Sequence, residues 1–294
     1  PLFRSAHYIT KIYYLKAYGK PTKITDYCKT IYYDLKVLTS IKNILKKEKV
    51  DLVVGMGGYY FDTNNIVYSY KIYQEAYCKN LEEIKKHFFL QNLKSNGYPW
   101  GKFYKHEIIK SNHLRFNEHL QINEDHLFVF QYLLCCKTIY ITPSKDYHYT
   151  VFRGNNIKLS SKRNPFHMHK LASECFKKEI NRMQTFWKLT SIEYNSLINE
   201  FVYSKRLLGL NSLCIQKDVT SFKEEIFYWK TRKYHPKNSF HKIILFIICT
   251  DILSTNIKFA FLRYIYALKE YNKKKKYIQY IYKSVNNCST QIIK

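Results

Sequence analysis

The sequence predicts an α/β domain followed by a helical, basic region, and three observations carry this prediction. Residues 49–55 form a short run rich in β-branched side chains, which is typical of a buried strand. Strand-like and helix-like segments alternate around it, as in α/β proteins. The polar, breaker-rich segment 160–165 then separates them from a stretch of helical periodicity. We therefore place a domain at 1–159 and a helical, basic C-terminal region at 160–294.

Each element of the first half has its own signal. Apolar residues three and four apart predict a helix at 34–47, and residues 59–61 form an aromatic strand after a glycine turn. A helix is expected from 70 to 93, with Leu81, Ile84, Phe88 and Phe89 directed inward. The apolar segment 126–136 reads as a further helix. Pro143 then separates two predicted strands at 138–142 and 146–152.

Charge and cysteine usage limit the partners and the compartment. The 294-residue chain has 49 Lys and Arg against 22 Asp and Glu, a net charge of +27. Such a field attracts polyanions. No nucleic-acid-binding motif accompanies it, so we expect no nucleic acid and favour a membrane surface or a phosphorylated substrate. The eight cysteines are scattered, which indicates a reducing compartment and predicts a cytoplasmic protein.

The C-terminal region carries a candidate membrane contact. Segments 243–253 and 259–268 are apolar, and Lys273–Lys276 follow as a positive block. Neither segment reaches the roughly 20 residues that span a bilayer. An apolar helix beside a polybasic cluster can lie on an anionic membrane, which predicts peripheral contact at the inner face of the plasma membrane. A packed core helix followed by a solvated tail explains the same pattern.

The candidate chemistry lies between residues 98 and 128. Glu124 and Asp125 directly precede the apolar helix, so the Asp125 carboxylate would lie at the helix N-terminus, where it could take a proton from an alcohol. Asn123 or Asp125 could instead simply cap the helix. Trp100 is either a core aromatic or a wall for a sugar ring. Lys102 is either a diphosphate contact or a surface lysine.

The order of these elements resembles a known family. Trp100-Gly101-Lys102-x-Tyr104, then Leu114-Arg115-Phe116, then Glu124-Asp125-x-x-Phe128 is similar to the acceptor half of family 2 glycosyltransferases. This resemblance implies a GT-A fold (Rossmann-like, with a mixed sheet) and inverting transfer of a sugar from a nucleotide-sugar donor to a glycan or lipid-linked acceptor, in surface polysaccharide or glycan synthesis. By resemblance, Asp125 is the base and Glu124 orients the loop. Trp100, Gly101 and Lys102 would shape the acceptor and diphosphate site.

The resemblance also implies a divalent cation, Mn²⁺ or Mg²⁺, on the diphosphate. Asp26 stands near the position of the family's Asp-x-Asp metal motif, but Cys28 replaces the second carboxylate, and Cys is a poor ligand for these ions. Only about 25 residues precede Asp26. We therefore expect the nucleotide-binding half to be missing or degenerate, and the chain alone to bind nucleotide sugars weakly. The alternatives are a truncated or degenerate non-catalytic relative, and a basic nucleic-acid-binding module.

Overall fold

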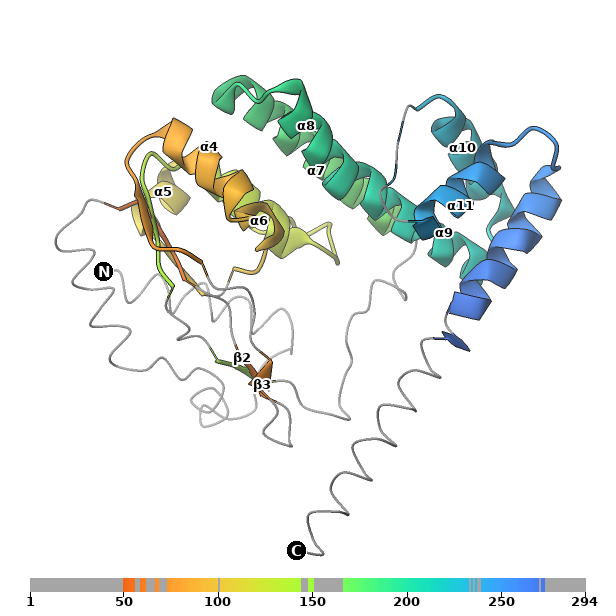
Figure 1. Cartoon of the computed structure of the whole chain (residues 1–294), viewed down its shortest axis with the longest axis horizontal. Helices are drawn as coiled ribbons and strands as arrows, with labels where there is room; N and C mark the ends of the chain where they lie inside the picture. Colours follow the sequence, from red (N-terminus) through yellow and green to blue (C-terminus); the bar gives the residue numbers. More distant parts are fainter. Residues whose placement is uncertain are drawn as a thin grey trace, which may run out of the picture. The chain divides into compact units, whose positions relative to one another are not determined.

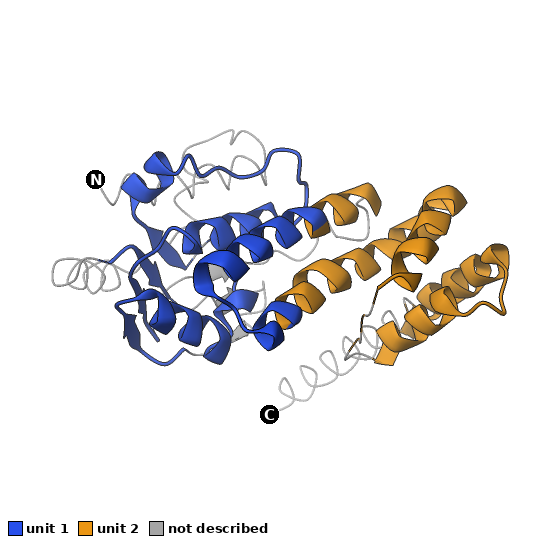
Figure 2. Cartoon of the chain, turned by 90° about the horizontal axis from the view of Figure 1, so that it is seen from above, with its two compact units in different colours: residues 1–159, 174–195 blue, residues 160–173, 196–294 orange. Residues whose placement is uncertain are grey.

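In this computed structural model, two parts of the chain form compact units. The structure describes residues 50–55, 59–61, 67–68, 73–99, 101–143, 148–150, 166–232, 234, 236, 239–269 and 271–272 (Figure 1). One unit comprises the described residues within 1–159 and 174–195, and the other comprises those within 160–173 and 196–294 (Figure 2). The predicted boundary between residues 159 and 160 lies outside the described residues, as does the predicted helix at 34–47.

The first unit contains a mixed four-stranded sheet in the order β4-β6-β1-β5. Its strands are β1 (Leu52–Val54), β4 (Ala76–Cys78), β5 (Lys102–Tyr104) and β6 (Ile139–Ile141). β1 runs parallel to β6 and antiparallel to β5, and β4 runs antiparallel to β6. All three side chains of β1 are buried, as the β-branched pattern predicts for a central strand. The α/β fold class with a mixed sheet and a helical C-terminal region is therefore confirmed.

A three-stranded sheet in the order β3-β2-β7 lies in the same unit. β2 (Tyr59–Phe61) pairs antiparallel with β3 (Val67–Tyr68) and parallel with β7 (His148–Thr150). β2 and β7 fall where strands are predicted. Pro143 comes two residues after β6 ends, so the two predicted strands around it belong to different sheets.

The prediction of one helix from 70 to 93 is wrong. β4 occupies part of that range, because Ala76–Cys78 pair with β6. The helix, α4 (Leu81–Leu90), begins only after Asn80, whose side chain accepts a hydrogen bond from the Glu83 N–H. A 3₁₀ turn, η1 (Leu93–Ser95), follows it. The inward direction of Ile84 and Phe88 is confirmed.

Aromatic side chains join the helices of the first unit. α4 runs beside α6 (Glu124–Leu133), with the rings of Phe88 and Phe130 5.7 Å apart (Figure 1). α7 (Phe166–Trp187) adds Phe176, 5.5 Å from Phe130, and Trp187, 5.0 Å from Phe88. All four rings are buried, so they form the aromatic centre of this core. The shorter α5 (His106–Ser111) precedes α6 along the chain, and α8 (Ser191–Leu197) follows α7.

The second unit is helical. It contains the π-helical η2 (Ile198–Tyr203), α9 (Ser204–Gln216), α10 (Val219–Lys230), α11 (Ser239–Cys249) and a helix at 255–269. Its core joins Leu210, Phe222, Ile244 and Leu262, one from each of the four helices after η2. Arg206 pairs with Glu225 inside this unit, with 2.9 Å between Nε and Oε2. Among the described residues, no helix is long and apolar enough to cross a membrane.

Candidate functional site

The site begins with the turn that enters β5. Gly101 has φ 69°, a left-handed conformation that favours glycine because other residues carry a Cβ that clashes there. Its carbonyl accepts a hydrogen bond from the Gly55 N–H at 2.8 Å, which ties the turn to the end of β1. The register pairs Val54 with Lys102. The predicted motif residues Gly101 and Lys102 therefore lie at the carboxyl end of β1.

Lys102 is buried, although lysine is rarely found inside a protein. Its ammonium donates to the Asn96 Oδ1 at 2.9 Å and to the Tyr98 carbonyl at 2.6 Å. Burial disfavours the charged form and lowers the pKa of Lys102 to about 7, while the Asp125 charge opposes this shift. Lys102 thus holds the 96–102 loop together. Its predicted contact with a diphosphate stays a prediction.

Asp125 occupies the second position of α6, directly after Glu124. Both side chains are half-buried. The Asp125 Oδ1 accepts from the His126 N–H at 2.7 Å, so the carboxylate satisfies one N–H of the first turn. Asn123 is the N-cap residue, but its φ is 59° and its side chain makes no capping hydrogen bond. The capping interpretation therefore applies to Asp125 rather than Asn123.

Lys102 of the first motif pair and Asp125 of the second are more than twenty residues apart in the sequence, but they lie near each other in the first unit. Asp125 is close enough to Lys102 to act on its pKa. Lys102 lies where the parallel strands β1 and β6 both end, since it pairs with Val54 and the Thr142 N–H donates to the Val54 carbonyl at 2.9 Å. Open α/β sheets bind ligands at the carboxyl ends of their parallel strands. The position is therefore one at which a binding site is expected.

His126 and Gly97 complete the site, and the sequence analysis missed both. The His126 Nε2 lies 2.7 Å from the Lys94 carbonyl, and its ring packs edge-on against Phe130 and Phe176. A Cβ on Gly97 would lie 1.9 Å from the His126 Cγ, so only glycine fits under this ring. The only sequence feature that could have pointed to them is their position within or next to residues 98–128, which contain the motif.

Two predicted site residues, Trp100 and Asp26, lie outside the described residues. In the part of the chain that the structure describes, no group of three or more His, Cys, Asp or Glu side chains could hold a metal ion. The predicted Mn²⁺ or Mg²⁺ and its ligand Asp26 therefore stay a prediction.

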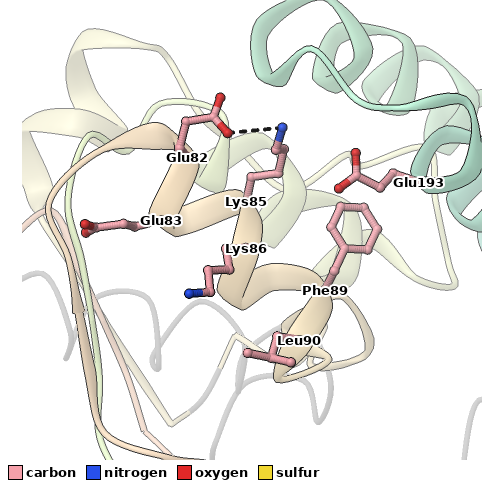
Figure 3. Close-up of a pocket in the computed structure, with 7 residues that line it drawn as sticks. All are labelled: Glu82, Glu83, Lys85, Lys86, Phe89, Leu90 and Glu193. Atoms are coloured by element: carbon pink, nitrogen blue, oxygen red, sulfur yellow. Dashed lines mark ion pairs between the residues drawn. The ribbon is translucent and has the colours of Figure 1, made fainter.

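A surface hollow elsewhere on the first unit shares no residue with this site. It is lined by Glu82, Glu83, Lys85, Lys86, Phe89, Leu90 and Glu193 (Figure 3). Glu82 and Lys85 form an ion pair of 3.2 Å within it. Three carboxylates and two ammonium groups line it, so it favours neither an anion nor a cation.

Comparison with known proteins gives partial likenesses. No protein-family model matches the chain, and no curated protein matches it significantly. Among solved structures, S. aureus TarS 1–349 in complex with UDP-GlcNAc aligns with a TM-score of 0.44 and 15% identity, over 63% of this chain and 53% of that one. TarS 1–349 in complex with UDP gives 0.41 and 15%, over 66% and 49%. TarS 1–349 alone gives 0.40 and 15%, over 74% and 51%.

The chain thus spans about half the length of these TarS structures. A likeness at this level of score and identity assigns neither a family nor an activity.

Proposed function

We propose that this chain forms the acceptor side of an inverting glycosyltransferase, which moves a sugar from a nucleotide-sugar donor to a hydroxyl in polysaccharide or glycan synthesis. One observation supports the proposal above the others. Lys102 lies opposite Val54 at the carboxyl end of β1, and the Asp125 charge is near enough to act on its pKa. A half-buried carboxylate near this edge of the sheet is in a suitable position to act as a general base.

The reaction assigns one step to Asp125. Its carboxylate takes the proton of the acceptor hydroxyl, and the oxygen forms a bond to the anomeric carbon. The bond from that carbon to the diphosphate oxygen breaks, and the nucleoside diphosphate leaves with the electron pair. Lys102 keeps the 96–102 loop in place beside the base through Tyr98 and Asn96. Trp100 and Glu124 contribute to the acceptor site by resemblance.

The deciding experiment is Asp125→Asn in the intact enzyme, with UDP- and GDP-sugars as donors and nucleotide release as the readout. Turnover should fall by about 10²–10⁴, the usual contribution of a general base. The melting temperature should barely change, because the Asn side-chain oxygen still accepts the His126 N–H. Turnover within about threefold of wild type would reject the catalytic role and leave Asp125 as a cap.

A degenerate, non-catalytic relative is the alternative that the sequence supports, since Cys28 replaces a metal carboxylate. Calorimetric titration of residues 1–294 with the same donors, with and without Mn²⁺, addresses it. We expect weak binding or none for this chain alone. Micromolar binding would contradict the expectation of a missing nucleotide half. A gel shift with random DNA and RNA that collapses with salt would instead favour nucleic-acid binding.

A further inference from the structure

The helix at 255–269 presents an apolar stripe to solvent. Ile257, Phe261, Tyr264 and Leu268 follow one another at steps of four, three and four residues, which places them on one face of a helix. Between 43% and 63% of each side chain is exposed. Tyr271 continues the series three residues later and is also exposed. We call Ile257, Phe261, Tyr264 and Leu268 the outer stripe.

The opposite face of the same helix is already in use. Phe259, Leu262 and Tyr266 are buried in the core of the second unit, together with Ile244 and Ile248 of α11. Packing in the core accordingly explains why one face of the helix is apolar, but it does not explain the apolar outer stripe. Aligned apolar side chains exposed together mark an interaction surface more often than scattered ones do.

The charge around the stripe indicates what covers it. Residues 239–269 contain three exposed cations, Lys242, Arg263 and Lys269, and a single acidic residue, Asp251, while Lys258 is buried. Asp251 forms an ion pair with Lys230 of α10. The described residues 255–269 of the helix that carries the stripe include no acidic residue, and Glu270 follows them in the sequence. An apolar face within a positive surface complements a negatively charged surface with an apolar interior.

We propose that this helix lies on an anionic lipid bilayer, in the plane of the interface, with the outer stripe inserted between the lipids. Its 15 residues measure about 22 Å along the axis, less than the roughly 30 Å of a bilayer core, so it can lie in the interface but not span it. Arg263 is exposed beside the stripe and can reach the headgroups. Tyr264 suits the headgroup level, where tyrosine is enriched. The proposal does not depend on sugar transfer.

The test is flotation of the full chain with vesicles of phosphatidylcholine alone and of phosphatidylcholine with phosphatidylglycerol. We expect binding to the anionic vesicles that weakens as salt is raised, and little binding to the neutral ones. The double variant Ile257→Gln/Phe261→Gln removes two apolar side chains from the stripe. It should lower the partition coefficient about tenfold or more.

A matched control separates the stripe from general hydrophobicity. Ile215 on α9 and Phe227 on α10 belong to the same unit and are exposed by 61% and 73%, so Ile215→Gln/Phe227→Gln makes the same two exchanges elsewhere. This variant should bind like wild type, and both should keep the wild-type melting temperature. Equal flotation with both vesicle types, or equal loss in both variants, would overturn the proposal. Self-association without vesicles that only the stripe variant abolishes would also overturn it, by identifying a second copy as the partner.

Discussion

Each end of β1 has an aspartate and a lysine, and the two pairs are built in opposite ways. At the amino end, the Asp51 Oδ2 accepts from the N–H groups of Lys137 and Thr138 at 2.8 and 3.2 Å, and Oδ1 lies 3.5 Å from the ammonium of Lys105. The carboxylate is nearly buried and its lysine is partly exposed. At the carboxyl end, Lys102 is buried and Asp125 is half-buried.

The difference separates a structural carboxylate from a candidate catalytic one. Asp51 uses its oxygens to join the start of β1 to the start of β6, and the Tyr132 hydroxyl donates to its carbonyl at 2.8 Å. A substrate could not replace these partners without opening the sheet. At the other end, the buried member is the lysine, which fixes the loop, and the Asp125 carboxylate accepts from the His126 N–H at the start of α6. The same residue types thus have different uses at the two ends.

Of the variants that test this comparison, Asp51→Ala should lose the most stability. The change leaves the Lys137 and Thr138 N–H groups without their acceptor and removes the ion pair, which should lower the free energy of unfolding by about 3 kcal/mol. Denaturant unfolding measures it. Asp125→Ala is the matched control and should cost about 1 kcal/mol, as loss of a helix cap does. Equal losses in the two variants would remove the distinction between the two ends.

The buried lysine predicts a pH dependence. The folded-state pKa of Lys102, about 7, lies below its ordinary value of 10.5. Between these pH values the unfolded chain holds a proton that the folded protein has released. The free energy of unfolding therefore gains a contribution that rises with pH across this window, by at most about 1.4 kcal/mol per pH unit. Below pH 7 that contribution stays at its minimum.

Lys102→Met removes this contribution. Between pH 7.5 and 9.5, the stability difference between wild type and Lys102→Met should change by up to about 2 kcal/mol in favour of wild type. Lys105→Met removes the partly exposed lysine of the other pair and keeps Lys102, so it should retain the wild-type slope. A flat difference for Lys102→Met would mean that Lys102 stays charged in the folded protein.

Local patterns predicted part of this arrangement. The β-branched run identified β1, and its burial agrees with the pattern, because a continuous apolar run is typical of a strand whose two faces are both covered. The motif order identified Lys102 and Asp125 as a pair worth comparing. The sequence did not predict β4, because Ala76–Cys78 become a strand only by pairing with β6, more than sixty residues away. It also did not predict the burial of Lys102, which depends on how the 96–102 loop folds over it.

The smallest effect concerns the packing that holds the first turn of α6. In Gly97→Ala, the new methyl group would meet the His126 ring, which must move away from the Lys94 carbonyl. We expect a loss of about 1–2 kcal/mol, in the range of overpacked cores. His126→Ala removes the ring, so the double variant Gly97→Ala/His126→Ala should be no less stable than His126→Ala alone.

Gly97→Ala, His126→Ala and the double variant form a double-mutant cycle, and Gly101→Ala is its control. The stability loss in Gly101→Ala comes from the left-handed φ of 69° and not from His126. It should lose about 1 kcal/mol whether or not the ring is present. Coupling between Gly97 and His126, without coupling between Gly101 and His126, would show that the ring is packed on the loop next to the base. Simple additivity in both cycles would mean that the His126 ring does not constrain the loop, and that the carboxyl end of β1 is less constrained than the amino end.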